Sequence, residues 1–193
     1  HIPYVINFSK FDYSGGTENW KIMSTSRGYV YAANNEGLLM YDGKNWHKHT
    51  LPNKTIVRSF AVDTTDNKIY VGGQDEIGYF EKDQHGFWSF KSLKPLMPKG
   101  FEAFEDVWDL QIGDHKVFFR TMYQVFCFDG NKIEKIPTSS YKINFIKWVD
   151  GQLIMGDASK GSFSYQNQSL TFTEGSGIFV GHRISDIISH RGK

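Results

Sequence analysis

The chain has 193 residues, and its 22 lysine and arginine residues nearly balance 21 aspartate and glutamate residues, for a net charge of +1. This balance does not favour direct contact with nucleic acid. No apolar stretch approaches the roughly 20 residues of a membrane helix, so we expect no membrane insertion by this segment. The single cysteine, Cys127, excludes an internal disulfide and a zinc site built from several cysteines. No secretion signal opens the chain, which fits either a cytosolic protein or one whose signal peptide has been removed.

Short strand-like units recur along the whole chain. Aromatic and β-branched runs alternate with clusters of Gly, Asn and Asp, which is typical of many short strands. One apolar unit recurs around Tyr31, Tyr70, Phe118 and Ile154, at intervals of 39, 48 and 36 residues. A second unit follows each of these by about seven residues, a third precedes each, and a weaker fourth comes last, so that each period of about 40 residues holds four units.

Taken in chain order, these units define four repeats and the beginning of a fifth. The predicted repeats cover residues 17–52, 55–93, 105–140 and 143–175, and the start of the fifth covers residues 183–193. Asp42-Gly43 and Asp129-Gly130 follow the third unit of their repeats and predict tight hairpin turns. The longest connection separates the second and third repeats, and there residues 101–110 come nearest to a helical pattern, with one helical turn at most.

Repeats of 40–50 residues with four strands each are typical of β-propeller blades. One such sheet cannot bury both of its faces, whereas sheets stacked around an axis cover one another. We therefore predict an all-β fold, a β-propeller with four four-stranded blades plus the first strand of a fifth. The favoured interpretation is a part of a larger, seven-bladed propeller. The alternative is a four-bladed ring that the N-terminal segment closes as an outer strand.

The first two repeats also match a known family in detail. The match runs through residues 18–22, 28–31, 33–39, 41–43, 55–59 and 69–72, and it is dense over roughly residues 4–80. This pattern resembles the two-component-regulator propeller family, the periplasmic sensor region of Bacteroidetes hybrid two-component systems and related transmembrane transcriptional regulators. The resemblance implies a periplasmic location in the ectodomain of an inner-membrane protein, with the rest of the parent ectodomain as a partner and a glycan fragment as ligand. The kinase or DNA-binding output module of such a parent is absent from these 193 residues.

Loops that converge on one face of a propeller are the natural place for a ligand site, because polar side chains there can bind sugar hydroxyls. The loops between second and third strands contain Asn35 with Glu36 in the first repeat and Asp75 with Glu76 in the second. The other interpretation of these residues is turn chemistry and solvated charge. The complete candidate set for ligand binding is Asn35, Glu36, Arg58, Asp75, Glu76, Asp109 and Arg120.

Five tryptophans follow the repeat. Trp20, Trp108 and Trp148 begin or lie in first strands, where packing between blades is favoured and stacking on a sugar is the alternative. Trp46 and Trp88 recur at the fourth-strand position and are interpreted as packing residues.

Other chemistry is weakly indicated. His47 and His49 would share one face of an outer strand, but no third metal ligand at a matching spacing is evident, and a solvated strand is the favoured interpretation. The acidic residues between positions 102 and 109 could act as paired carboxylates on a glycoside, although a solvated loop fits them better. Cys127 lies in an apolar run and is expected to be an inert thiol. We predict no catalytic residues, no metal and no cofactor.

Three functions follow from these patterns. The favoured one is an extracytoplasmic ligand-sensing segment of a bacterial signalling or transcription regulator that responds to a glycan fragment. The alternative is a non-catalytic protein-interaction scaffold, in which the open edges of an incomplete ring invite pairing, for example as a homodimer. An enzyme is the third, and the absence of a convergent acid pair argues against it.

Overall fold

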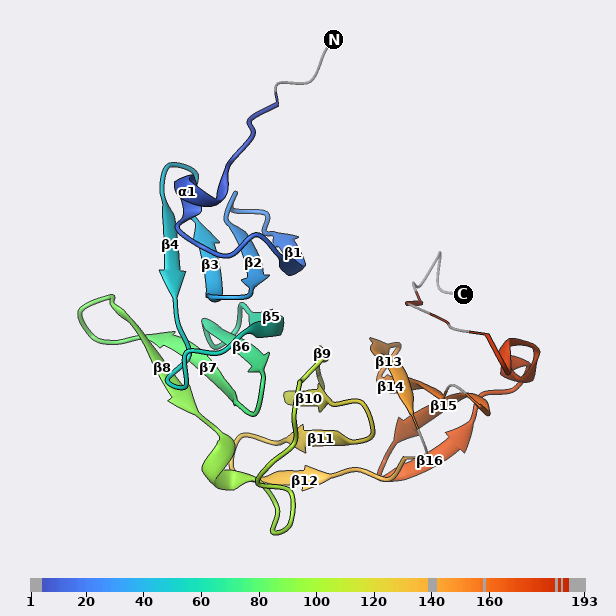
Figure 1. Cartoon of the computed structure of the whole chain (residues 1–193). Helices are drawn as coiled ribbons and strands as arrows, with labels where there is room; N and C mark the ends of the chain where they lie inside the picture. Colours follow the sequence, from blue (N-terminus) through green and yellow to red (C-terminus); the bar gives the residue numbers. More distant parts are fainter. Residues whose placement is uncertain (1–4, 139–141, 158, 183, 185, 188–193) are drawn as a thin grey trace.

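The computed structural model describes residues 5–138, 142–157, 159–182, 184 and 186–187. It contains four antiparallel sheets of four strands each, arranged along an open arc (Figure 1), which confirms the prediction of four four-stranded units. Each sheet lies within one predicted repeat and has its strands in sequence order. The strands are β1 (Asn19–Ser24), β2 (Val30–Asn34), β3 (Gly37–Tyr41) and β4 (Trp46–His49); β5 (Val57–Asp63), β6 (Lys68–Gly73), β7 (Ile77–Lys82) and β8 (Trp88–Ser92); β9 (Asp109–Gly113), β10 (Lys116–Arg120), β11 (Val125–Phe128) and β12 (Ile133–Lys135); and β13 (Ile143–Val149), β14 (Gln152–Asp157), β15 (Gly161–Gln166) and β16 (Ser169–Phe172).

The turns after the third strands are built by aspartate. The Oδ1 atom of Asp42 accepts two backbone N–H groups that follow it, at 2.8 and 2.6 Å, and Asp129 does the same at 2.9 Å for both bonds. Both predicted hairpins are confirmed, since β3 pairs with β4 and β11 with β12. Only the glycine of each Asp-Gly pair has a positive φ, +95° at Gly43 and +99° at Gly130, so a longer loop replaces the expected two-residue turn. Hydrogen bonds from the backbone, with a further one from a histidine, lower the pKa of Asp42 to about 2.

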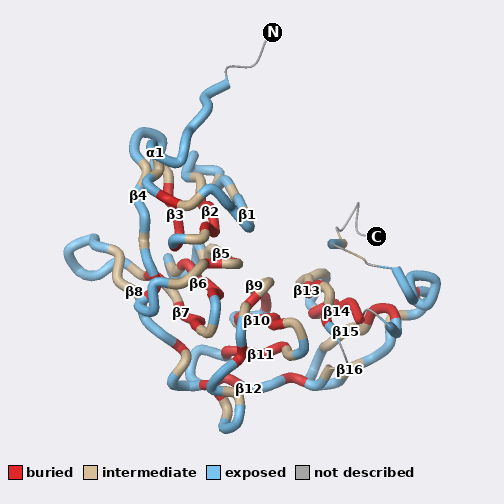
Figure 2. The backbone as a smooth tube through the Cα atoms, in the orientation of Figure 1, coloured by how far each residue is buried: buried red, intermediate tan, exposed pale blue. Residues whose placement is uncertain are grey.

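Stacking of the sheets forms the core. The first strands β1, β5, β9 and β13 lie along the inner side of the arc, and each contacts the next (Figure 1). Buried side chains fill the three spaces between neighbouring sheets, with Phe60 in the first, Phe119 and Phe126 in the second and Ile146 in the third. The buried residues accordingly follow the strands, and exposed residues occupy the turns (Figure 2). Each such large side chain contributes about 1.5–3 kcal/mol relative to exposure, so neighbouring sheets stabilise one another.

The N-terminal segment covers part of the first sheet. Its short helix α1 (Lys10–Tyr13) lies beside β4, and the rings of Phe8 and Tyr13 lie 5.6 and 5.8 Å from that of Trp46. The fully buried Asn34 amide accepts the N–H of Gly16 and donates to its carbonyl oxygen, both at 2.8 Å. The described part of this segment forms no strand, and it lies at the opposite end of the arc from the fourth sheet (Figure 1). The four-bladed ring closed by an N-terminal strand is therefore not the observed arrangement.

The connection between the second and third sheets is irregular. Its helical turn, η1 (Lys94–Leu96), contains Pro95 and precedes residues 101–110, which hold no helix, so the prediction of a helical turn there is wrong. The reason is packing: Phe104 and Val107 are buried between the two sheets, and the N–H of Val107 donates to the carbonyl oxygen of Gly73 at 3.0 Å.

A second 3-10 turn, η2 (Ser176–Phe179), follows the fourth sheet and contacts β15. The predicted fifth repeat, residues 183–193, falls mostly outside the described residues. Within the described chain, no helix has the length and apolar character needed to span a bilayer.

Candidate functional site

One face of the arc gathers all seven predicted ligand residues. The first strand of each sheet begins where the second strand ends, as the pairing of Val57 with Gly73 and of Asp109 with Arg120 shows. The loops between second and third strands and the connections into first strands therefore share one face, which we call the loop face. The aspartate-containing turns after the third strands lie at the other ends of the strands, and therefore on the opposite face.

An arginine at the start of β5 joins three sheets on the loop face. The guanidinium carbon of Arg58 lies 4.0 Å from the ring centroid of Trp20 in β1 and 4.8 Å from that of Trp108, which precedes β9. The two tryptophan rings also meet edge to face, with centroids 6.1 Å apart. A cation against an aromatic face is attracted by the ring quadrupole, most strongly for tryptophan. The arrangement therefore ties the first, second and third sheets together at the inner side of the arc.

Asp106 completes this arginine cluster, by which we mean Trp20, Arg58, Asp106 and Trp108. Its carboxylate accepts the Arg58 Nε–H at 3.1 Å and an Nη2–H at 3.4 Å, and the two side chains are only 12% and 18% exposed. Paired charge-assisted hydrogen bonds of this kind fix a guanidinium in position. The Nη1 atom of Arg58 is buried and has no hydrogen-bond partner among the residues that the structure describes.

Trp20 carries the exposed part of the cluster. The residue is 43% exposed, its Nε1–H donates to Oδ1 of Asn35 at 2.7 Å, and the Asn35 amide donates to Oε2 of Glu18 at 3.1 Å. A partly exposed indole framed by an amide and a carboxylate offers an apolar surface for the C–H groups of a sugar ring and polar atoms for its hydroxyls. The neighbouring Glu36 turns away from this frame and pairs with Lys48 of β4 at 2.8 Å.

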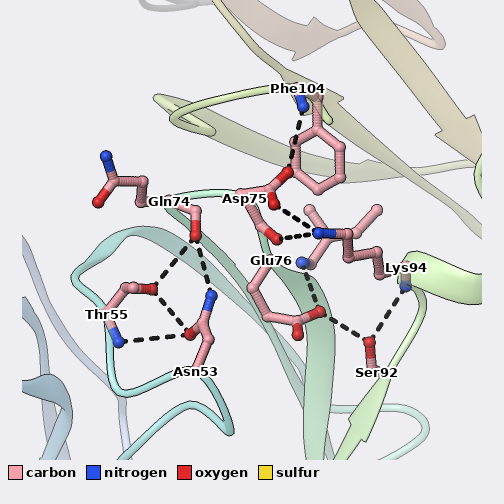
Figure 3. A network of polar contacts seen from close by, with 9 residues as sticks. Asn53, Thr55, Gln74, Asp75, Glu76, Ser92, Lys94 and Phe104 are labelled. Atoms are coloured by element: carbon pink, nitrogen blue, oxygen red, sulfur yellow. Dashed lines mark hydrogen bonds and ion pairs between the residues drawn. The ribbon is translucent and has the colours of Figure 1, made fainter. Parts of the chain in front are cut away.

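The candidate Asp75 is engaged within the protein. Figure 3 shows its carboxylate between the Lys94 ammonium group, at 2.5 Å, and the backbone N–H of Phe104, at 3.2 Å. Both partners belong to the connection that leads into the third sheet. Asp75 has a positive φ of 54°, which the loop requires at this point. These bonds anchor the connection on the loop face.

Glu76 is also engaged internally. Its side chain is buried, and Oε1 accepts the Ser92 hydroxyl at 2.7 Å and the N–H of Ile77 at 3.0 Å. Asn53 belongs to the same region, since its side-chain amide donates to the carbonyl oxygen of Gln74 at 3.1 Å (Figure 3). A ligand role for Asp75 or Glu76 stays a prediction.

Asp109 and Arg120 join the third sheet to the fourth. Oδ2 of Asp109 accepts the N–H of Ile146 at 3.4 Å, and Nη1 of Arg120 donates to the carbonyl oxygen of Ile143 at 2.8 Å. On the first sheet, burial lowers the pKa of Lys21, which the charge of Asp109 opposes. Charged side chains from separate sheets thus influence one another across the inner side of the arc.

A depression of about 430 Å³ opens on the loop face between the third and fourth sheets. Trp108 forms part of its wall, so the depression adjoins the arginine cluster. Its lining contains three basic side chains and no acidic one. The residues that define its chemistry are Trp108, Arg120, Met122, Lys142, Asn144 and His182.

A second depression, of about 360 Å³, lies between the second and third sheets and includes turn residues of the opposite face. Its lining mixes acidic residues, among them Asp63, Asp66 and Asp114, with a lysine and two tyrosines. No group of three or more potential metal-ligating side chains occurs among the described residues, these acids included.

The tryptophans divide into two classes. The packing predicted for Trp88 and Trp148 is confirmed, because both rings lie against buried clusters between sheets, and Trp46 packs under the N-terminal segment. Packing between blades is confirmed for Trp20 and Trp108 as well, because their rings contact each other and Arg58 of the second sheet, although this contact lies on the loop face. The sequence signal that separates them is position, because they stand at or just before the start of a first strand.

Asp106 was expected in a solvated acidic loop and instead forms the ion pair with Arg58. Its partner lies in another sheet, so the acidic run alone carried no sign of the pairing. The other loop acids also have separate roles: Glu102, for example, accepts the N–H of Gly100 at 2.9 Å.

The remaining candidates have plain structural surroundings. Burial raises the pKa of the Cys127 thiol to about 11, so it remains protonated at neutral pH, as expected of an inert thiol. His47 pairs with Asp42 at 3.1 Å, whereas His49 lies with its ring 5.6 Å from that of Phe80. Burial lowers the pKa of His49, which favours the neutral ring.

Comparison with known proteins identifies the fold. No family model and no curated protein match the chain. Solved structures do: the extracellular domains of BT4673 and BT3049 from B. thetaiotaomicron, each described as a putative hybrid two-component system, give TM-scores of 0.58 and 0.57 at 15% and 13% identity, over 79% and 77% of this chain. Virginiamycin B lyase from Staphylococcus aureus gives 0.63 at 14% identity, over 80% of this chain and 55% of its own. The chain spans about a fifth of the two extracellular domains, 21% in each case. These similarities establish a β-propeller fold, and two of the three structures are extracellular domains of the kind that the sequence resemblance names.

Proposed function

We propose that the chain is an extracytoplasmic ligand-sensing propeller segment of a bacterial transmembrane signalling regulator, located in the periplasm, and that it responds to a glycan fragment. The observation that carries the proposal is the partly exposed Trp20 ring, held by Arg58 on one side and framed by Asn35 and Glu18. The sequence resemblance and the fold shared with sensor ectodomains support the same function.

The arginine cluster also suggests how binding is passed on. Because Trp20, Arg58 and Trp108 come from three successive sheets, a ligand that moves Trp20 alters contacts in all three. Packed interfaces respond to small displacements by shifting between discrete arrangements. We propose that this shift changes how the segment packs against the rest of the parent ectodomain.

The ends of the arc support a larger propeller. Ile22 on the first sheet is 66% exposed and points to the side of that sheet away from the second, as its pairing with Ala32 shows. At the other end Phe172, Ile178 and Phe179 are 47%, 75% and 46% exposed. Apolar side chains at both ends suit packing against further blades, and we propose a seven-bladed ring in the parent protein.

The same exposed ends favour a second candidate, an interaction scaffold in which they pack against another copy of the chain. Light scattering across a concentration series separates the two possibilities. Concentration-dependent dimers that disappear in an Ile178→Ser variant would support the scaffold. A chain that stays monomeric at all concentrations would contradict the scaffold function and leave the sensing function as the proposal.

Calorimetric titration with a panel of neutral and acidic cell-wall and dietary oligosaccharides tests the sensing function. We expect saturable binding to at least one oligosaccharide, and its loss in Trp20→Ala. Trp88→Phe is the matched control, because Trp88 lies on an outer strand against the core between the first two sheets. Failure of the whole panel to bind, or equal loss in both variants, contradicts the proposal.

A further inference from the structure

The depression beside Trp108 differs in charge from the rest of the loop face. It lies where β13 begins, so Lys142 stands at its rim, and His182 reaches it from the segment that follows η2. Arg120 lies beneath, 9% exposed and bonded to the carbonyl oxygen of Ile143. Three basic side chains from three separate parts of the chain thus surround one hollow.

Two acids of the loop face bond to groups other than Lys142 and His182. Asp106 is committed to Arg58, and Asp109 directs Oδ1 at the N–H of Leu110 and Oδ2 at the N–H of Ile146. Lys142 and His182 are exposed and form no ion pair with any residue that the structure describes. A lysine ammonium group without a counter-ion at a concave surface attracts anions to it, and the His182 imidazole beside it can donate a hydrogen bond to them.

The remaining lining adds an apolar wall and a polar contact. Trp108 and Met122 present apolar surface, and Asn144 presents an amide, which both donates and accepts hydrogen bonds. The volume of about 430 Å³ falls within the range of small-ligand pockets, about 300–1,000 Å³. An apolar wall, one amide and two basic groups without ion pairs among the described residues suit a ligand ring that carries a negative charge.

We infer that this depression binds a saccharide bearing a carboxylate or sulfate group, with the sugar ring against Trp108 and the acidic group between Lys142 and His182. This inference rests on the proposed sensing function and narrows it to an acidic ligand. Trp108 then joins the two parts of the loop face, because it contacts the ligand on one side and Arg58 on the other.

Matched pairs of oligosaccharides test the inference by calorimetry on the 193-residue chain. Oligogalacturonate and its methyl ester share a backbone and differ in carboxylate charge, and sulfated and unsulfated dextran oligomers do the same for sulfate. We expect at least one charged member to bind about tenfold more tightly than its neutral mate, and which member does so identifies the acidic group. Inorganic sulfate serves as the probe for a simple ion site.

Substitutions then locate the binding. Lys142→Gln and His182→Gln each remove one basic group, and each is expected to weaken the charged oligosaccharide about fivefold while leaving its neutral mate unchanged. Lys91→Gln is the matched control, because Lys91 is an exposed lysine on the outer strand β8. It is expected to change neither affinity.

Four results overturn the inference. Equal binding of charged and neutral mates shows that the depression does not select an acid, and it leaves the sensing function standing. Equal weakening by Lys91→Gln and Lys142→Gln shows attraction by overall charge, and binding of inorganic sulfate as tight as that of the sulfated oligomer shows an ion site only. Absence of binding by all four oligosaccharides overturns the inference, and the sensing function falls with it only if the broader panel also fails.

Discussion

The arginine cluster should stabilise the fold well beyond an ordinary surface ion pair. Replacing Arg58 with alanine leaves the Asp106 carboxylate, which is only 18% exposed, without its counter-ion. Truncating one partner of a buried pair costs about 3–5 kcal/mol, and each lost cation–π contact costs about 0.5–1 kcal/mol more. Since neither side chain is completely buried, we expect the free energy of unfolding to fall by about 3 kcal/mol, less than the sum of these contributions.

Urea unfolding followed by far-ultraviolet circular dichroism measures this loss without relying on tryptophan emission. Arg58→Lys keeps the charge but not the planar fork, so its loss should be smaller than that of Arg58→Ala. Asp106→Ala and the double variant complete a cycle, in which we expect a coupling energy of about 1–3 kcal/mol. A loss below about 1 kcal/mol for Arg58→Ala, or a coupling energy near zero, would refute the view that the cluster ties three sheets together.

Three further predictions concern stability. In Gly113→Ala the new Cβ would overlap the ring of Trp148, so we expect the free energy of unfolding in urea to fall by about 1–3 kcal/mol. This loss should nearly disappear when Trp148→Ala is already present, and an unchanged loss would contradict the packing of Gly113 against Trp148. Asn34→Ala removes the amide that bonds to Gly16, and it should lower the free energy of unfolding by about 1–3 kcal/mol and speed limited proteolysis before residue 16. An unaltered cleavage rate would show that Asn34 does not hold the N-terminal segment in place. Burial raises the pKa of Tyr70 to about 12 from 10.0, so the folded state favours the neutral phenol. The free energy of unfolding should therefore fall by about 2–3 kcal/mol between pH 10 and 12. The same fall in Tyr70→Phe would show that Tyr70 is not its cause.

The repeat pattern made the sheets predictable because each blade is a local structure. Four strands that follow one another in sequence pair in the same order, so the spacing of Tyr31, Tyr70, Phe118 and Ile154 reports the architecture directly. The form of the turns was less predictable. Asp42 bonds to backbone N–H groups that follow it, and this side-chain capping supports a longer loop than the dipeptide alone suggests.

The candidate site was predictable only as a face of the molecule. All seven predicted residues lie on the loop face, but their neighbours there depend on how far the arc turns between sheets, which no local pattern encodes. Trp20 and Trp108 belong to the first and third repeats and meet through Arg58 of the second. His182 lies outside the four repeats, so periodicity gave no reason to place it beside Lys142.

The bonding partners of Asp75 and Glu76 were also not predictable from the sequence. An acidic pair after a glycine-rich strand end suggests an exposed ligand contact, yet their carboxylates bind Lys94 and Ser92 within the second sheet and its connection. Loop carboxylates satisfy nearby donors wherever the chain supplies them, and the supplying lysine and hydroxyl lie well downstream in sequence. Residues near a loop tip can therefore lie on the loop face while their side chains bond within the protein.

The central claim is that ligands are bound on the loop face, and hydrogen exchange measured by mass spectrometry tests it most directly. With oligogalacturonate present, we predict slower amide exchange in residues 101–108, 121–124 and 142–144, and unchanged exchange in the turns at residues 42–45 and 129–132. Protection confined to those turns, at the opposite ends of the strands, would contradict the account.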